Sequence, residues 1–153
     1  MINFFIVLGT FLFMEFVAWF THKFIMHGFL WSLHRDHHVK DTTRWFERND
    51  FFFLIFALPS ITLFYFGVGE SLGITFFIGL GILLYGICYF LVHDTFIHQR
   101  FKVFKRSENT YLRALRKAHK IHHKSFEKHH GSCFGMLIVP WKYVREARQS
   151  SKS

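Results

Sequence analysis

The chain has 153 residues, of which 51% are hydrophobic and 21% aromatic, including 23 Phe. Only 19% are charged, below the roughly 25% of an ordinary soluble domain, which argues against a disordered chain and against a typical cytosolic enzyme. The two cysteines, Cys88 and Cys133, form no C-x-x-C pair, so neither a disulfide framework nor a zinc finger is expected. The net charge of +9 suggests nucleic acid as one partner, and the positions of the charges decide that question.

Three long apolar runs dominate the chain. The first, residues 2–21, contains Glu15 as its one acidic or basic side chain, and at about 1.5 Å per residue it spans roughly the 30 Å hydrocarbon core of a bilayer. The second, residues 51–68, is interrupted by Pro59, which membrane helices tolerate. The third, residues 72–92, is rich in Gly, which lets helices approach closely in lipid. We therefore predict an all-α membrane protein with three to four transmembrane helices.

The basic residues lie next to the ends of these runs. Five of the 19 Lys and Arg fall in residues 22–50, the other fourteen fall in residues 99–153, and the link between the second and third runs carries only Glu70. With three crossings, both basic segments share one side of the membrane, which the positive-inside rule assigns to the cytoplasm. Anionic lipid accounts for this charge, and because no nucleic-acid-binding fold is recognisable, we expect no nucleic acid partner. Residues 111–124 are predicted to form a cationic amphipathic helix along the membrane interface.

Ten of the 12 histidines form four clusters at or beyond the cytoplasmic ends of the crossings. Two clusters have the pattern H-x4-H and two have the pattern H-x2-H-H. Side chains three and four apart share one helix face, so each H-x2-H-H cluster presents three imidazoles together. Residues five apart lie about 140° apart around an α-helix, so each H-x4-H pair either straddles two neighbouring metal ions or lies on a locally distorted helix. The ten histidines are His22, His27, His34, His37, His38, His93, His98, His119, His122 and His123.

Ten imidazoles are too many for one metal ion. A mononuclear centre takes about four to six ligands, whereas ten favour a dinuclear centre with about five nitrogens per metal. Imidazole suits Zn, Cu, Fe and Ni, and a nitrogen-rich shell of this size fits redox iron better than four-coordinate zinc. The remaining pair, His129 and His130, adjoins Gly131 and breaks the pattern, so we predict loop residues there.

The four clusters, at these positions relative to the crossings, resemble those of the fatty acid hydroxylase superfamily of membrane non-haem di-iron enzymes. The clusters alone fit fatty acid hydroxylases, sterol oxidases and desaturases, whereas the residues between them and the short chain resemble the carotenoid branch. The similarity runs from about Met14 to Pro140. Besides the histidines, it is carried by Trp31, Asn49-Asp50, Val92-His93-Asp94, His98-Gln99-Arg100-Phe101, Ala118-His119, Phe134-Gly135-Met136 and Pro140.

This resemblance implies two Fe ions held by the ten histidines, dioxygen as co-substrate and electrons from reduced ferredoxin. The implied reaction adds hydroxyl groups at C3 and C3′ of β-ionone rings, taking β-carotene through β-cryptoxanthin to zeaxanthin, with the carotenoid arriving from the bilayer. We expect one membrane hydroxylase domain over residues 1–148, with histidine clusters in 22–38 and 93–123 that form a cytoplasmic di-iron cap. Residues 149–153 are expected to be a frayed tail.

Two alternatives stay open. Within the enzyme class, the chain is a fatty-acid or sterol hydroxylase or desaturase. From another class, it is a metal-transporting or metal-binding membrane protein, although transport places ligands near the bilayer midplane and the middles of all three runs lack His. Asp36, Asp50 and Asp94 are candidates for orienting imidazole N–H groups and are equally well read as surface or capping acids. Glu15 is expected to face the helix bundle, because an ionisable group facing lipid is expensive.

Overall fold

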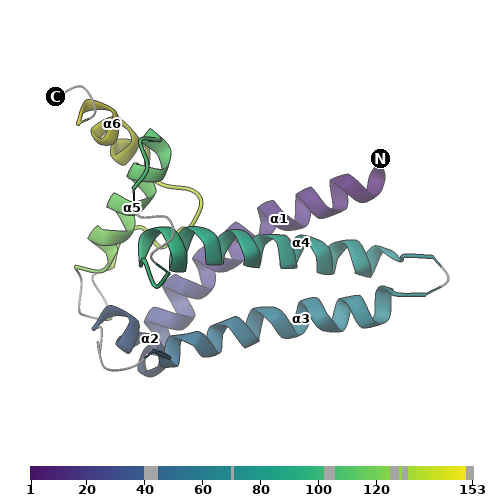
Figure 1. Cartoon of the computed structure of the whole chain (residues 1–153). Coiled ribbons are helices and arrows are strands. Elements are labelled where there is room, and N and C mark those ends of the chain that lie inside the picture. Colours follow the sequence, from purple (N-terminus) through teal and green to yellow (C-terminus); the bar gives the residue numbers. More distant parts are fainter. Residues whose placement is uncertain (40–44, 70, 102–105, 125–127, 129–130, 151–153) are drawn as a thin grey trace.

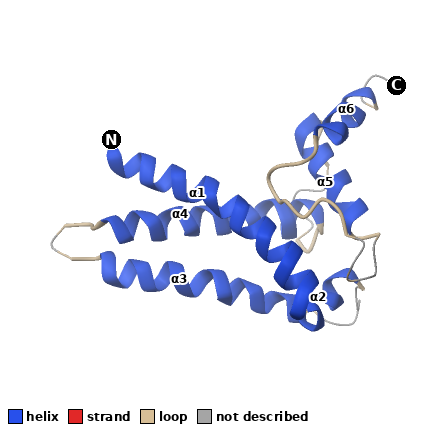
Figure 2. Cartoon of the chain, turned by 180° about the vertical axis from the view of Figure 1, so that it is seen from behind, coloured by secondary structure: helices blue, strands red, loops and turns tan. Residues whose placement is uncertain are grey.

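The structure, a computed structural model, describes residues 1–39, 45–69, 71–101, 106–124, 128 and 131–150. Over these residues the chain forms helices joined by short connections and contains no strand (Figures 1 and 2). Three helical segments are long and apolar enough to cross a membrane, namely Ile2–Phe29, Arg48–Gly67 and Ile74–Ile97. The chain is therefore an all-α integral membrane protein, and its described part has the lower of the two crossing numbers that we expected.

Two of the crossings change from α-helix to π-helix at the same end of the molecule. Helix α1 (Ile2–Phe20) continues as the π-helix η1 (Thr21–Phe29). Helix α4 (Ile74–Tyr89) continues in the same way as η3 (Phe90–Ile97). Both crossings therefore extend beyond the ends predicted from hydropathy. One H-x4-H pair lies within η1, and the other consists of His93 in η3 and His98 directly after it.

The third crossing, α3 (Phe51–Gly67), follows a 3-10 turn, η2 (Arg48–Asp50), and pairs with α4 as an antiparallel hairpin (Figure 1). Small residues set the distance between these helices, because the Ser60 hydroxyl donates a 2.8 Å hydrogen bond to the carbonyl of Gly79. A Cβ atom on Gly81 would lie 2.6 Å from Cβ of Thr10 in α1. The glycines of the third run thus permit the close helix packing that their spacing predicted.

The remaining helices gather at one end of the bundle. The N-terminus and the α3–α4 connection lie at the opposite end from α2 (Trp31–His38), α5 (Thr110–His122) and α6 (Trp141–Gln149), as Figure 1 shows. The chain turns from η1 into α2 at Gly28, whose φ of −101° and ψ of −123° leave the helical region. This end of the bundle contains the described histidines.

The cationic amphipathic helix predicted at 111–124 is present as α5. Asn109 caps its N-terminus by accepting hydrogen bonds from the backbone N–H groups of Tyr111 and Leu112 at 2.9 and 3.1 Å. Its apolar face packs against α6, and its expected position along the membrane interface stays a prediction. Helix α6 was not predicted and includes Gln149, the first residue of the expected frayed tail. The buried side chains of this α5–α6 contact are Ala114, Leu115, Ala118, Val139, Tyr143 and Ala147.

Candidate metal centre

The structure brings all ten clustered histidines together at the end of the helix bundle that carries α2 and α5. Nine of them form two groups, and within each group the nearest ligand atoms all lie within 4.8 Å of one another. The tenth, His123, places its Nε2 atom 2.9 Å from Nε2 of His119 in the second group. Eight of the ten side chains are buried, and His98 and His123 are half-buried. The first histidine group is His22, His27, His34, His38 and His122; the second is His37, His93, His98 and His119.

Each half of the chain contributes one histidine to the group that is formed mainly by the other half. In the first H-x2-H-H cluster, His34 and His38 join the first group, whereas the middle residue, His37, joins the second. In the other H-x2-H-H cluster, the middle residue, His122, crosses in the opposite direction. Each group is therefore completed by a side chain from the half of the sequence that supplies most of the other group.

The π-helices explain the H-x4-H spacing. A π-helix closes hydrogen bonds from residue i to i+5, so residues five apart face the same way on it. His22 and His27 on η1 accordingly both belong to the first group, with ring centroids 5.3 Å apart. His93 and His98 at η3 both belong to the second group, with centroids 4.5 Å apart. Of our two interpretations of this spacing, the local helix distortion is the one observed.

Hydrogen bonds at Nδ1 fix the orientation of several rings. His22 Nδ1 donates to the carbonyl of Phe134 at 3.0 Å, and His122 Nδ1 donates to that of Ser132 at 2.9 Å. A carbonyl oxygen can only accept, so the proton of each of these rings is on Nδ1 and the lone pair is on Nε2. His27 has the same arrangement with the carbonyl of Lys128 at 3.3 Å. These partners present the Nε2 atoms as ligands in the manner of metal-binding imidazoles.

The Nε2 atoms face one another at short range. His27 Nε2 lies 3.3 Å from Nε2 of His122, and the Nδ1 contacts above leave both atoms with lone pairs. Two facing lone pairs repel unless a cation lies between them, so this donor set fits metal ions. The same short Nε2 contacts recur in the second group, at 3.2 Å between His37 and His93 and 2.9 Å between His98 and His119.

Burial keeps these imidazoles neutral. Loss of solvation is the largest cause that lowers the pKa of His34, to about 2, and the pKa of His122, to about 3. The same cause, reinforced by neighbouring imidazoles, holds the pKa of His37 and of His119 well below the ordinary value of 6.5. Because neutral imidazole is the form that coordinates metal, the unprotonated rings need no proton release before binding.

Two side chains that we did not single out as orienting groups hold imidazoles. Glu47 Oε2 accepts a 2.7 Å hydrogen bond from Nδ1 of His37, and Asn49 Oδ1 lies 2.7 Å from Nδ1 of His34. Both lie in or next to the short η2 turn, where Glu47 and Asp50 form a reciprocal capping box. That box is a sequence signal for a helix start, but nothing in it indicates a contact with a histidine.

The three aspartates proposed as orienting groups have different surroundings. Asp94 Oδ1 lies 3.6 Å from Nδ1 of His93. Asp50 instead forms a two-pronged ion pair with Arg100, with both distances 2.7 Å. Asp36 accepts a 2.6 Å hydrogen bond from the backbone N–H of Arg48. Only Asp94 among the three is thus placed directly beside an imidazole nitrogen by these contacts.

Glu15 faces the bundle, where it binds the segment that supports His22. Its carboxylate accepts hydrogen bonds from the backbone N–H groups of Met136, Leu137 and Ile138, each at 2.9 Å, and from the Tyr85 hydroxyl at 2.7 Å. This buried carboxylate anchors residues 134–138 to α1. The predicted loop residues His129 and His130 lie outside the described residues.

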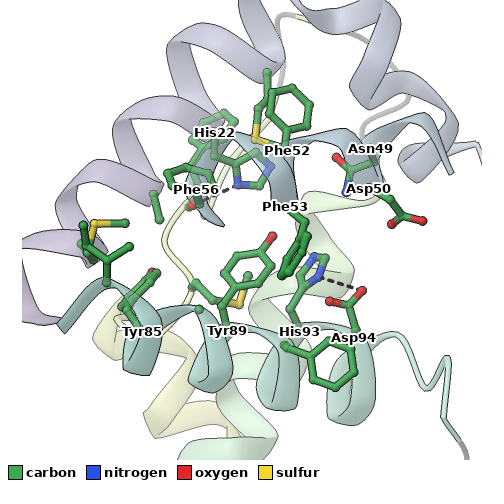
Figure 3. Close-up of a pocket in the computed structure, with 18 residues that line it drawn as sticks. His22, Asn49, Asp50, Phe52, Phe53, Phe56, Tyr85, Tyr89, His93 and Asp94 are labelled. Carbon is green, nitrogen blue, oxygen red and sulfur yellow. Dashed lines mark hydrogen bonds and ion pairs between the residues drawn. The ribbon is translucent and has the colours of Figure 1, made fainter. Parts of the chain in front are cut away.

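An apolar pocket adjoins the histidines. It has a volume of about 120 Å³ and lies between α1, α3 and α4, with aromatic and Met side chains along most of its wall (Figure 3). At its inner end it contacts His22 of the first histidine group and His93 of the second. A molecule in this pocket therefore lies beside one imidazole of each group.

These features define a class of protein: an integral membrane protein whose buried histidines suit metal ions and adjoin an apolar pocket. The fatty acid hydroxylase family model matches residues 7–145. The chain belongs to the fatty acid hydroxylase family and is an oxygenase.

The chain is similar to proteins of bacteria and plants that are named as beta-carotene hydroxylases. The chain is 37% identical to a beta-carotene hydroxylase of Paracoccus sp. (strain N81106 / MBIC 01143), over 92% of this chain and 86% of that protein. It is 38% identical to a beta-carotene hydroxylase of Pantoea ananas, over 90% of this chain and 78% of that protein. It is 39% identical to the chloroplastic beta-carotene 3-hydroxylase 2 of Arabidopsis thaliana over 87% of this chain, but spans only 44% of that longer protein. No solved structure matches the chain.

Proposed function

We propose that this chain hydroxylates carotenoids at C3 and C3′ of their β-ionone rings, converting β-carotene through β-cryptoxanthin to zeaxanthin. The observation that carries the proposal is the position of the apolar pocket, which contacts one imidazole of each histidine group. The names of the bacterial and plant relatives support the carotenoid as substrate. A hydrocarbon ring suits a pocket whose wall is mostly Phe, Met and Tyr side chains.

The ten clustered histidines would hold two iron ions, about five nitrogens to each, with His123 completing the second group. When bound, the iron ions supply the activation of dioxygen and the oxidation of an unreactive C–H bond. The protein itself orients the imidazoles and excludes water from the reacting carbon. The Phe134 carbonyl and Glu47 orient His22 and His37, and the apolar wall keeps water away from the ring carbon.

We further propose that the histidine end of the bundle faces the cytoplasm and receives electrons from a reduced ferredoxin. The positive-inside rule supports this orientation, because the basic segments flank the histidine clusters. The same positive charge favours association with an acidic electron carrier. The membrane itself supplies the substrate, since the pocket lies between membrane-spanning helices.

The direct test is expression in cells that accumulate β-carotene, followed by chromatography of the pigments. We expect β-cryptoxanthin and zeaxanthin to appear. Unchanged pigment in cells that contain intact, iron-loaded protein would contradict the carotenoid proposal and favour an acyl-chain or sterol substrate within the same family. A purified sample analysed for metal tests the expected two iron ions per chain.

Gly86 offers a way to test the pocket specifically. It lines the pocket, and a Cβ added there meets no atom within 4 Å. Gly86→Leu should therefore fill the pocket without disturbing helix packing and lower product formation at least about tenfold. Gly9→Leu is the matched control, because Gly9 on α1 is equally open and lies outside the pocket. Equal product from both variants would show that this pocket does not hold the substrate.

A further inference from the structure

Two tyrosines on α4 line the pocket one helical turn apart, and their hydroxyl groups differ. Tyr85 donates its hydroxyl proton to Glu15 at 2.7 Å. Tyr89 packs its ring against His93, with centroids 4.7 Å apart and an interplanar angle of 32°. Its hydroxyl points into the open space between His22, Phe53 and His93 (Figure 3). Within the described part of the chain this hydroxyl forms no hydrogen bond.

The other polar groups at the histidine end of the pocket are either engaged or out of a ligand's reach. Asp94 lies 3.5 Å from Arg100, and His93 Nδ1 has no hydrogen-bond partner but is fully buried. Asp50 is bound by Arg100, and Asn49 by His34. His22 uses its Nδ1 on the Phe134 carbonyl, and its Nε2 belongs to the first histidine group. The Tyr89 hydroxyl therefore stands out in this pocket as a polar group that a ligand can reach and that has no partner.

We propose that the Tyr89 hydroxyl is the group that binds oxygen attached to the ring of the ligand, so that the pocket discriminates a hydroxylated ring from an unsubstituted one. A phenol both donates and accepts a hydrogen bond, as an alcohol does. A polar group left without a partner in an apolar pocket is unfavourable, and this applies to the tyrosine and to a newly formed ring hydroxyl alike. A hydrogen bond between the Tyr89 hydroxyl and the ring hydroxyl gives each of them a partner. This inference rests on the proposed function, since it takes the pocket as the site of the ring.

The position of Tyr89 suits this role. The reacting carbon lies beside His22 and His93 if the metal ions are held as proposed, and the Tyr89 ring packs directly on His93. A hydroxyl group formed at C3 thus arises close to the Tyr89 hydroxyl. Tyr89 is a specificity-determining residue in this scheme, because it contacts the ring substituent.

The test compares two small ligands that differ by one hydroxyl group, β-ionone and 3-hydroxy-β-ionone. Their binding to the oxidised, metal-loaded protein in phospholipid nanodiscs is measured by equilibrium dialysis without an electron donor, so that neither ring is converted. Tyr89→Phe should weaken binding of the hydroxylated ring about 3- to 10-fold, the value of one net hydrogen bond, and change binding of β-ionone less than about twofold. Tyr65→Phe, the same change at a site on α3 that is 78% exposed, should alter neither.

Each outcome decides a different point. If Tyr89→Phe leaves the ratio of the two affinities unchanged while both ligands bind, the role of Tyr89 is refuted and the proposed function stands. If neither ligand binds the parent protein, the pocket is not the ring site, and both proposals fail. Metal content and thermal unfolding of Tyr89→Phe check that the fold is retained. Tyr89→Leu removes the hydroxyl together with the ring, and this second variant should show the same loss of discrimination.

Discussion

His37 Nδ1 donates a hydrogen bond to Glu47 Oε2 at 2.7 Å, although the two residues are separated by a segment that begins at the end of α2 and ends at η2. Both side chains are shielded from water, with side-chain exposures of 4% and 15%. A carboxylate on the far nitrogen fixes the ring and makes Nε2 a stronger ligand. Glu47 therefore supports the histidine that crosses into the second group.

We predict that Glu47→Gln weakens metal binding about 10- to 100-fold, because the amide is a poorer acceptor and supplies no charge. The measurement is iron retained per chain during dialysis against a graded chelator series. Glu146→Gln serves as control, because Glu146 pairs with Lys117 on the exposed surface of the α5–α6 pair. Equal iron retention by the two variants would contradict a role for Glu47 at the metal.

The exchanged histidines give a second prediction. His37→Ala and His122→Ala should each abolish product and lower bound iron by at least about half, because each removes a ligand from the group completed by the other half of the chain. Membrane insertion should be unchanged, since neither residue lies in a membrane-crossing segment. Pigment chromatography and metal analysis of membrane fractions measure both effects. The double variant His129→Ala with His130→Ala should retain activity. Product formation by His37→Ala or by His122→Ala would refute the ligand role of that histidine.

Glu15 gives a prediction about stability. Glu15→Ala leaves three backbone N–H groups and the Tyr85 hydroxyl without their shared acceptor. We expect a loss of about 3–5 kcal/mol in the free energy of unfolding, as for other broken buried networks. Tyr85→Phe removes one of these four donors and should cost about 1 kcal/mol. Denaturant unfolding in detergent, followed by circular dichroism, compares them, and equal stability of the two variants would show that the backbone contacts contribute nothing.

Arg100 joins the start of α3 to the end of η3. Its guanidinium binds both oxygens of Asp50 at 2.7 Å and the carbonyl of Trp45 at 2.8 Å. Arg100→Lys keeps the charge but loses the two-pronged geometry, so we expect a loss of about 1 kcal/mol of stability. Arg145→Lys on the exposed side of α6 is the comparison, expected to be neutral. If thermal unfolding gives the same midpoint for both, the Asp50 pair is not a structural clamp.

The sequence predicts the parts of this molecule that depend on local periodicity. The three crossings follow from apolar runs of membrane length, and the packing glycines, such as Gly79 and Gly81, follow from their spacing. The clustering of ten histidines is visible because the H-x4-H and H-x2-H-H patterns repeat in the same order. These features need only a few consecutive residues to specify them.

Other features depend on contacts between distant parts of the chain. Glu15 binds backbone groups more than 120 positions away, and a backbone donor leaves no mark in a residue pattern. The exchange of His37 and His122 depends on how α2 and α5 are docked. Hydropathy also cannot distinguish α-helix from π-helix, so the predicted crossings end within the first residues of η1 and η3. The cover of α5 by α6 was missed for a similar reason, because an apolar helix face suits protein and lipid equally well.

The reciprocal exchange of His37 and His122 has a consequence for biosynthesis. The first histidine group cannot be complete until the ribosome has translated residue 122, although the other four members of the group precede residue 39. The second group is likewise incomplete until residue 119 has been translated. Two metal ions held as proposed would therefore be captured by an assembled molecule rather than one after the other as the chain emerges.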